Sequence, residues 1–249
     1  MSSVNTLFVN PPLRPALDLG VFRVLAERRS VEKDACGDFF AFRLRGPKRL
    51  VAVIGDACGH GQDAANLLPG VLRRLEAAGG VERPGELLSR LNHGLASELS
   101  SDRFVTLTAI EIDAQARTLT VANAGHVPAF LRRASGEVQI VGHASGPPLG
   151  ILDEASYFDD TYRIDKGDVL VLMTDGVLEA VETDLTDMPI LAALVGQGVG
   201  SSGAVHGRLL EQLAARLEQR APDDMTLLSF ELLAEARKAT LVGGMRALV

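Results

Sequence analysis

The sequence is poor in aromatic residues, cysteine and positive charge. Its 249 residues include no Trp, two Tyr and nine Phe, so few rings are available to stack on nucleic-acid bases. The 25 Lys and Arg residues are outnumbered by 32 Asp and Glu, and the resulting net charge of -7 argues against a nucleic-acid-binding protein, whose affinity comes largely from cations on phosphates. Two cysteines cannot form the disulfide framework of a small secreted protein. We therefore expect no nucleic-acid partner.

Long hydrophobic segments are also missing. No run approaches the roughly 20 apolar residues that cross a membrane. The first residues, MSSVNTLFVNPPLRP, lack the basic start and apolar core of a signal peptide. Hydrophobic residues make up 47% of the chain and charged residues 23%, which is the balance of an ordinary globular protein. The sequence therefore predicts a cytoplasmic protein that does not bind membranes.

One domain accounts for most of the chain. Residues 1–17 contain several prolines and no periodic pattern, so we expect them to form an extended lead-in. No repeat, low-complexity block or linker divides the chain after this point. We expect a single domain over residues 18–234 and a C-terminal tail over residues 235–249, because the tail shows no distinctive pattern.

Short apolar segments predict a protein rich in β-hairpins. Four pairs of strand-like segments flank short turn sequences. These pairs are 39–44 with 50–54, 104–112 with 118–124, 127–133 with 137–141, and 157–164 with 168–174. Single strands are expected at 19–26 and 225–233. The first turn is basic, and its expected solvent-exposed tip consists of Arg43, Arg45, Lys48 and Arg49.

Three segments have the apolar spacing of amphipathic helices, at 62–78, 84–99 and 203–220. Pro69 lies inside the first of them and predicts a kink or a break, because proline has no amide hydrogen and clashes with the preceding turn. Hairpin-linked strands with helices clustered between them are typical of an α+β domain, in which layers of helices cover antiparallel sheets.

Acidic residues gather at four strand ends that also contain glycine or a second acid. These segments are CGD at 36–38, GDACGHG at 55–61, TDG at 174–176 and PDD at 222–224. If the first hairpin turns at its proline, Asp38 lies opposite Asp56 on the neighbouring strand. Asp175 ends one strand, while Asp223 and Asp224 precede another. Antiparallel pairing would bring these residues to a common end as well.

Carboxylates that converge in this way are expected to bind metal ions. Like charges about 4.5–5.5 Å apart repel each other unless a cation lies between them. Hard oxygen ligands without paired imidazoles or thiolates favour Mg²⁺ or Mn²⁺ over Zn²⁺, and two such ions can clamp a displacement at phosphorus. The alternative is that each acidic residue only forms a turn or a solvated strand end. Composition and spacing alone leave both interpretations open.

Seven motifs, in order, resemble those of the PPM-type (protein phosphatase 2C-like) phosphatases, and most closely the bacterial SpoIIE/RsbU group of serine/threonine phosphatases. They extend from about residue 20 to residue 233 and read CGDFF, VIGDACGHG, FVTLTAIEID, VANAGHVPAFL, GPPLGI, VLVLMTDGVLEA and DDMTLL. The resemblance implies a four-layer α-β-β-α sandwich with a binuclear Mn²⁺ or Mg²⁺ site at one edge of its two sheets. It also implies hydrolysis of phosphoserine or phosphothreonine on a protein without a phosphoenzyme intermediate.

The resemblance also implies which residues bind the metal ions. Carried over by motif, the ligands are Asp38, Asp56, Ala57, Asp175 and Asp223, with Asp224 as the alternate to Asp223. In this set Asp56 would bridge both ions, and Ala57 would contribute its backbone carbonyl. A water that bridges the two ions would then be the nucleophile, and no side-chain nucleophile would be needed.

Two histidines lie in matching motifs and are candidate general acids. His60 belongs to the GHG segment and His126 to the NAGH segment. An imidazole can protonate a leaving serine oxygen near neutral pH. Each histidine could equally fix a loop through hydrogen bonds, and the sequence leaves both roles open.

Three positions depart from the usual pattern of the family. Cys36 replaces the first of two glycines, Ala41 lies where an acidic residue is common, and Cys58 replaces a serine. We expect the two cysteines to be small buried residues, with oxidation beside the metals as the alternative. These departures support one alternative function, a catalytically weak phosphatase-like binding module that sequesters a signalling partner. A small-molecule phosphohydrolase would use the same metals but has no motif of its own in this chain.

The resemblance also implies partners. The expected substrate is a phosphorylated bacterial signalling protein, namely a STAS-domain anti-sigma-factor antagonist. The helices expected at 62–78 and 84–99 correspond to a pair that can switch the metal site in this branch of the family. A regulatory protein that acts on these two helices is therefore a further hypothesis for this chain.

Overall fold

The computed structural model describes most of the chain. The described residues are 7–10, 17–32, 35–59, 61–78, 83–100, 102–180, 188–198, 200–217, 223–237 and 247–248. His60, one of the two candidate general acids, lies outside the described residues. Among the described residues, no helix is both long and apolar enough to cross a membrane.

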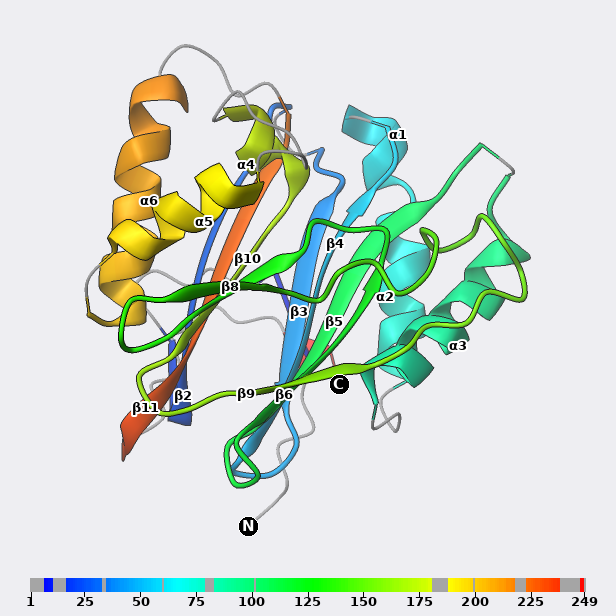
Figure 1. Ribbon diagram of the computed structural model, residues 1–249. Coiled ribbons are helices and arrows are strands. Elements are labelled where there is room, and N and C mark those ends of the chain that lie inside the picture. The colour runs from blue at the N-terminus through cyan, green and yellow to red at the C-terminus, as the bar shows by residue number, and fades with distance from the viewer. Residues whose placement is uncertain are drawn as a thin grey trace.

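Antiparallel strands form two sheets that stack face to face (Figure 1). The strands of the larger sheet are β1 (Leu7–Val9), β3 (Asp38–Leu44), β4 (Arg49–Ala57), β5 (Val105–Asp113), β6 (Thr118–Ala124), β9 (Asp160–Arg163) and β12 (Ala247–Leu248). The strands of the smaller sheet are β2 (Leu17–Arg29), β7 (Ala129–Arg132), β8 (Val138–Val141), β10 (Val169–Met173) and β11 (Met225–Arg237). The seven-stranded sheet has the order β12-β1-β3-β4-β5-β6-β9, and the five-stranded sheet has the order β2-β11-β10-β7-β8.

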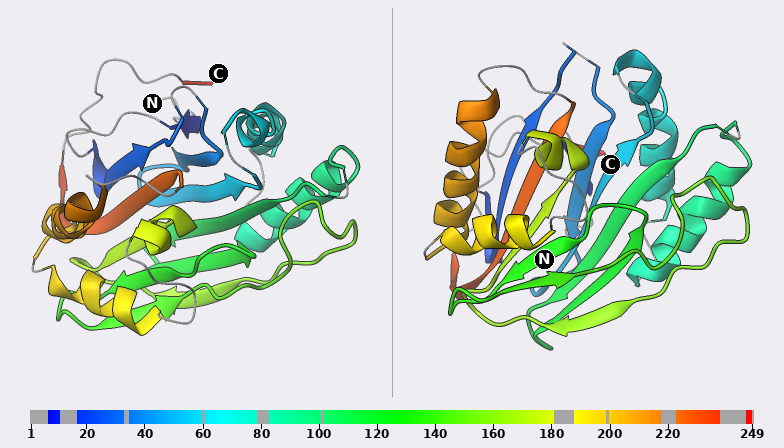
Figure 2. Two further views of the ribbon diagram at one scale, coloured as in Figure 1. Left: turned by 90° about the horizontal axis from the view of Figure 1, so that it is seen from above. Right: turned by 45° about the horizontal axis from the view of Figure 1, so that its top comes forward.

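Helices cover the outer face of each sheet (Figure 2). The seven-stranded sheet is covered by α1 (Gly61–Ala65), α2 (Leu68–Ala77) and α3 (Pro84–Ala96). The five-stranded sheet is covered by α4 (Asp175–Ala180), α5 (Met188–Gln197) and α6 (Ser202–Leu217). The result is a four-layer α-β-β-α sandwich, which confirms the α+β class and the layer order implied by the sequence.

Apolar side chains fill the space between all four layers. Between the two sheets, the largest buried side chains are at most 2% exposed and include Phe22, Phe40, Ile54, Ile110 and Phe230. A second apolar cluster lies under α1, α2 and α3, and a third lies under α4, α5 and α6. Because burial of one such side chain contributes roughly 1.5–3 kcal/mol, these three clusters hold the strand ends in fixed positions.

The first hairpin has the register that the sequence predicts. Asp38 of β3 pairs with Asp56 of β4, and Leu44 pairs with Leu50 near the turn. The predicted hairpins β5–β6 and β7–β8 are present as well. The first two acidic residues therefore lie at the same end of neighbouring strands.

The helix break predicted at Pro69 is also present. The helix α1 ends before α2 begins, and Pro69 lies in the first turn of α2, where its missing amide hydrogen costs no intrahelical bond. The helices expected at 84–99 and 203–220 correspond to α3 and α6. The apolar pattern does not predict α4 or α5, because α4 is short and α5 is apolar on most of its surface.

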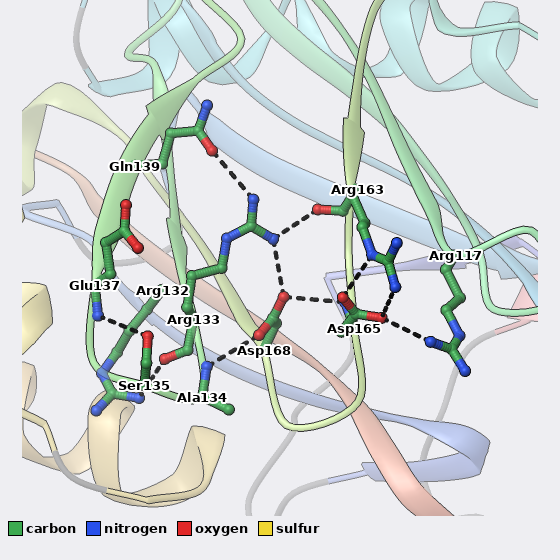
Figure 3. Close-up of polar contacts among 10 residues, drawn as sticks. All are labelled: Arg117, Arg132, Arg133, Ala134, Ser135, Glu137, Gln139, Arg163, Asp165 and Asp168. Carbon is green, nitrogen blue, oxygen red and sulfur yellow. Dashed lines mark hydrogen bonds and ion pairs between the residues drawn. The ribbon is translucent and has the colours of Figure 1, made fainter.

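The fourth predicted hairpin, 157–164 with 168–174, is wrong. β9 pairs with β6 in the seven-stranded sheet, whereas β10 lies between β7 and β11 in the five-stranded sheet. The chain crosses between the sheets at this turn. The Asp168 carboxylate accepts hydrogen bonds there from the backbone amides of Ala134 and Asp165, at 2.9 Å and 3.0 Å (Figure 3). A turn sequence alone does not distinguish a hairpin from a crossing of this kind.

Residues outside the predicted domain also form strands. β1 lies within the expected lead-in and pairs with β3, while β12 lies within the expected tail and pairs with β1. The strands predicted at 19–26 and 225–233 are longer in the structure, as β2 and β11. The expected lead-in and tail therefore both add to the edge of the seven-stranded sheet. The division of the chain into one domain and two flanking segments stays a prediction.

Candidate metal centre

Acidic residues from separate parts of the chain meet at the end of the sandwich where α1 and α4 begin (Figure 1). The β3–β4 hairpin brings two of them to this end. The antiparallel pairing of β10 with β11 brings the residues that follow β10 and precede β11 to the same end. We call this group the acidic cluster, and its members are Asp38, Asp56, Asp175, Asp223 and Asp224.

Asp38 is held in the buried part of the cluster by two threonines. It is 1% exposed, and its Oδ2 accepts a hydrogen bond from the Thr174 hydroxyl at 2.8 Å. The Thr226 amide donates to Thr174 Oγ1 at 2.9 Å, so the hydroxyl proton of Thr174 is directed at Asp38. The pKa of Asp38 is raised to about 7, because burial and the charges of Asp224 and Asp175 outweigh the two threonines, which lower it.

Asp56 lies among the other carboxylates of the cluster. Burial, together with the negative charges of the other four members, raises the pKa of Asp56 to about 9. Desolvation and the charge of Asp223 also raise the pKa of Asp175. Crowded carboxylates of this kind favour either a bound proton or a bound cation. The electrostatics of the cluster are therefore those of a cation site.

Gly37 leaves a small space free beside two oxygen atoms. A Cβ at this position would lie 3.1 Å from Asp56 Oδ1 and 3.1 Å from the carbonyl oxygen of Ala57. It would also lie 2.9 Å from Cβ of Ala64 in α1. The Asp56 carboxylate and the Ala57 carbonyl therefore face the same space, and both are hard oxygen ligands that suit Mg²⁺ and Mn²⁺.

The donor set fits a hard divalent cation in its chemistry. Its side-chain donors are all carboxylates, and the cradle beside Gly37 adds a backbone carbonyl. Among the described residues, however, no three His, Cys, Asp or Glu side chains already lie close enough together to hold one ion. Like charges with no cation between them are expected to stay apart. The predicted ligand set therefore stays a prediction, with a donor chemistry that agrees with it.

Asp223 and Asp224 use their carboxylates differently. Asp224 is 6% exposed, and its Oδ1 and Oδ2 accept hydrogen bonds from the backbone amides of Val31 and Gly37 at 2.9 Å and 2.8 Å. Asp223 is only partly buried, and its Oδ1 accepts a hydrogen bond from the amide of Asp224 at 2.7 Å. Asp224 therefore ties the start of β11 to the β2–β3 connection, which favours Asp223 as the ligand of the pair.

We predict that substitutions of these two neighbours separate activity from stability. Asp224→Asn should lower the free energy of unfolding by about 1–3 kcal/mol, because one of two backbone amides loses its charged acceptor. Asp223→Asn should leave that free energy within about 0.5 kcal/mol of wild type, yet lower Mn²⁺-dependent hydrolysis of an aryl phosphate more than about tenfold. Urea unfolding and steady-state kinetics measure the two effects. The reverse pattern would make Asp224 the ligand.

His126 is buried and makes structural contacts. Its Nδ1 lies 2.8 Å from Thr106 Oγ1, and its backbone amide donates to Asn123 Oδ1 at 2.7 Å. Asn123 Nδ2 donates back to the carbonyl of His126 at 2.9 Å. Burial lowers the pKa of His126 to about 4, so its ring is neutral at pH 7. These contacts support a loop-fixing role, and its role as a general acid stays a prediction.

The two cysteines lie close to the cluster in sequence but differ in exposure. Cys36 is 8% exposed, and burial raises the pKa of its thiol to about 12, so almost no thiolate forms at neutral pH. Cys58 is partly exposed, and its Sγ accepts a hydrogen bond from the Phe104 amide at 3.2 Å. The expectation that both cysteines are buried is therefore confirmed for Cys36 and wrong for Cys58.

The sequence interpretation missed the threonines that support Asp38. Thr174 is the first residue of the TDG segment, and Thr226 lies in the DDMT segment, so both stand next to predicted ligands. The Thr174 amide also donates to the Thr226 carbonyl at 3.0 Å, which links the ends of β10 and β11. The one available signal was their position in these motifs. Only the stacking of the two sheets brings the Thr174 hydroxyl within reach of Asp38.

Comparisons with known proteins identify relatives of this chain. The sequence model of the family described as stage II sporulation protein E (SpoIIE) matches residues 46–233. Phosphoserine phosphatase RsbU of Bacillus subtilis (strain 168) is 26% identical over 221 residues, which are 87% of this chain and 64% of RsbU. The chain therefore spans less than two thirds of the length of that relative.

Solved structures share the fold of this chain. The PP2C phosphatase domain of SpoIIE from Bacillus subtilis, solved with a fragment of its regulatory domain, has a TM-score of 0.73 at 19% identity over 90% of this chain and 65% of that chain. RsbX in complex with magnesium has a TM-score of 0.66 at 22% identity, over 85% and 95% of the two chains. The catalytic domain of the serine/threonine phosphatase PstP, in complex with two manganese ions, has a TM-score of 0.59 at 20% identity, over 86% and 99%. Because the family model matches more than half of its length, the chain belongs to the stage II sporulation protein E (SpoIIE) family.

Proposed function

We propose that this chain is a metal-dependent protein-serine/threonine phosphatase that acts in the cytoplasm. The observation that carries the proposal is the acidic cluster, in which separate segments of a SpoIIE-family sandwich bring carboxylates to one end. The relative RsbU bears the name phosphoserine phosphatase. Structures that share the fold hold magnesium or manganese, which supports Mn²⁺ or Mg²⁺ as the cofactor.

In this proposal the chain supplies metal ligands rather than a nucleophile. Asp38, Asp175 and Asp223 would hold one of two Mn²⁺ or Mg²⁺ ions. Asp56 would be a ligand of both ions, and the carbonyl of Ala57 would help to hold the second. When bound, the two ions would supply an acidified water and positive charge for the phosphoryl oxygens.

Other residues keep these ligands oriented. The Thr174 hydroxyl donates to Oδ2 of Asp38 and leaves Oδ1 for a ligand role. Asp224 holds the amide of Gly37, which borders the space beside Asp56. Metal ligands that are already held in their binding orientation cost less free energy to order when the substrate binds. The low pKa of His126 favours the other candidate histidine, His60, as the general acid for the leaving oxygen.

The proposed substrate is phosphoserine or phosphothreonine on a bacterial signalling protein, namely a STAS-domain anti-sigma-factor antagonist. The family motifs and the name of RsbU support this choice. A protein substrate also agrees with the position of the cluster at one end of the sandwich, where partly exposed carboxylates can meet a phosphorylated side chain.

We also propose that a regulatory protein acts through the helices predicted at 62–78 and 84–99. The helix α1 begins only a few residues after Asp56, and its Ala64 packs beside Gly37. A partner that shifts α1 would therefore move the space between Asp56 and the Ala57 carbonyl. The helices α2 and α3 pack on the same face of the sheet and would transmit such a shift.

A second candidate function is a catalytically weak binding module that sequesters a signalling partner. The observation that favours it is that Cys36 and Cys58 stand in place of the usual glycine and serine. The intact set of carboxylates favours the phosphatase.

One assay separates these functions. The purified chain is incubated with an aryl phosphate and with a phosphorylated STAS-domain protein, each with Mn²⁺ or with a chelator. The phosphatase proposal predicts hydrolysis of both substrates that stops on chelation. Hydrolysis of the aryl phosphate alone would support a small-molecule phosphohydrolase. Binding of the phosphoprotein without hydrolysis of either substrate would support the sequestering module.

A further inference from the structure

A polar cleft lies between the β3–β4 and β5–β6 turns. These turns lie at the opposite end of the sandwich from the beginnings of α1 and α4, where the acidic cluster lies (Figure 1). It has a volume of about 700 Å³, and its charged lining residues are Arg45, Lys48, Arg49 and Asp113. Asp56 lies seven positions after Arg49 in β4, which corresponds to about 23 Å at the usual rise of a strand. The cleft is therefore distinct from the proposed metal centre.

The one carboxylate in this cleft is already occupied by hydrogen-bond donors. Asp113 Oδ1 accepts hydrogen bonds from the amides of Gln115 and Ala116, both at 2.8 Å, and its Oδ2 accepts one from Arg49 Nε at 2.8 Å. Burial would raise the pKa of Asp113, but these hydrogen bonds outweigh it and lower the pKa. The charge of Asp113 is thus balanced by these donors, so Asp113 does not repel an anion in the cleft.

Positive charge in the cleft exceeds what Asp113 can balance. Within the described residues, neither Arg45 nor Lys48 forms an ion pair with a carboxylate. The expectation of a solvated tip is wrong for Arg43, which is 8% exposed and donates to the Leu75 carbonyl at 3.0 Å. Burial lowers the pKa of Arg43, and the charge of Arg45 lowers it further, whereas the charge of Glu76 raises it. Among the described residues, the cations of the cleft that have no carboxylate partner are therefore Arg45 and Lys48.

The excess of positive charge continues into a neighbouring cleft of about 290 Å³ that shares Ala116 as a lining residue. Arg117 and Arg163 line this cleft, and both donate to a single carboxylate, that of Asp165, at 3.0 Å and 2.7 Å (Figure 3). Two arginines on one carboxylate leave one positive charge in excess. A chain with a net charge of -7 therefore carries a basic end and an acidic end.

We propose that the basic cleft between the β3–β4 and β5–β6 turns binds an acidic segment of a partner protein. The planar fork of Arg45 matches a carboxylate, and Lys48 adds a flexible charge. The volume suits a short peptide segment. A long polyanion such as a nucleic acid would extend beyond the basic end toward the net negative remainder of the chain, which disfavours it. The partner would then dock at one end of the sandwich, and the acidic cluster lies at the other end.

Anisotropy of a labelled oligo-glutamate peptide at low ionic strength tests this proposal on the full chain. The double variant Arg45→Gln with Lys48→Gln should bind the peptide about tenfold more weakly than wild type, and added salt should weaken wild-type binding. The matched control is Arg73→Gln with Arg208→Gln, which removes two exposed cations from α2 and α6. This control should bind within about twofold of wild type.

Three results would overturn the proposal. They are no binding by the wild-type chain, equal weakening in both double variants, and tighter binding of an oligothymidylate through the same two residues. Neither double variant should change the melting temperature or aryl phosphate hydrolysis, because the substituted residues lie outside the acidic cluster. The binding measurement does not depend on hydrolysis, so a failure of this proposal can be distinguished from a failure of the proposed phosphatase activity.

Discussion

Replacement of Asp56 by asparagine (Asp56→Asn) is expected to abolish metal-dependent hydrolysis while it stabilises the metal-free protein. Asparagine has one carbonyl oxygen and no charge, so it cannot bridge two cations as the proposed ligand set requires. We expect the kcat/KM for Mn²⁺-dependent hydrolysis of an aryl phosphate to fall about 10³-fold or more, because several kcal/mol of transition-state stabilisation depend on the ions. Steady-state kinetics in excess Mn²⁺ measure this effect.

The expected gain in stability follows from the charges around Asp56. Burial and the neighbouring carboxylates raise its pKa to about 9, and a tenfold change in acidity corresponds to about 1.4 kcal/mol. A neutral amide avoids this repulsion but needs hydrogen bonds of its own, which reduces the gain. At pH 8 we expect the free energy of unfolding to rise by about 1–2 kcal/mol and the melting temperature by about 2–8 °C. Calorimetry of the metal-free variant measures the change.

The matched control is Asp153→Asn, which removes the same charge from an exposed position. The side chain of Asp153 is 68% exposed and lies beside His93 of α3. This variant should leave hydrolysis unchanged and the free energy of unfolding within about 0.5 kcal/mol of wild type. If Asp56→Asn lost hydrolysis and stability together, Asp56 would be a residue that supports the fold, and its assignment as a bridging ligand would be wrong.

The sequence could predict those features of the cluster that depend on local pairing. The turn of the first hairpin sets its register, so the position of Asp38 opposite Asp56 follows from the chain itself. Asp175 and Asp223 follow and precede strands that were recognisable one by one. Asp175 and Asp223 come together only if β10 pairs with β11 in the antiparallel direction. The sequence supported this pairing as an expectation, and the structure contains it.

Features that depend on contacts between distant segments could not be predicted in the same way. The turn after β9 has the residues of a hairpin, yet pairing with β6 places β9 in the other sheet. The Thr174 hydroxyl reaches Asp38 only because the two sheets stack. The distinction between Asp223 and Asp224 rests on backbone amides of the β2–β3 connection. In each case the deciding partner is far away in the sequence, and periodicity carries no information about it.

Removal of metal is expected to destabilise the protein, and more at pH 8 than at pH 6. In the metal-free protein the pKa values of Asp38 and Asp56 are about 7 and about 9, well above the ordinary value of 3.8. The folded state therefore keeps protons that the unfolded state has released. The stability that these groups contribute is full below about pH 4 and is lost as the pH rises through about 7 and about 9. The metal-free protein should accordingly melt at a lower temperature at pH 8 than at pH 6.

Bound Mn²⁺ should reverse this loss, because metal ligands must be deprotonated and the cation competes with protons for them. With free Mn²⁺ at one hundred times its Kd, we expect a stabilisation of about 2.7 kcal/mol and a rise in melting temperature of about 5–10 °C at pH 8. The rise should be smaller at pH 6 for the same Mn²⁺ concentration, and a chelator should abolish it at both pH values. Asp56→Asn should show a smaller rise with a flatter dependence on pH. An equal rise at both pH values, or one unchanged in Asp56→Asn, would place the bound cation away from the acidic cluster.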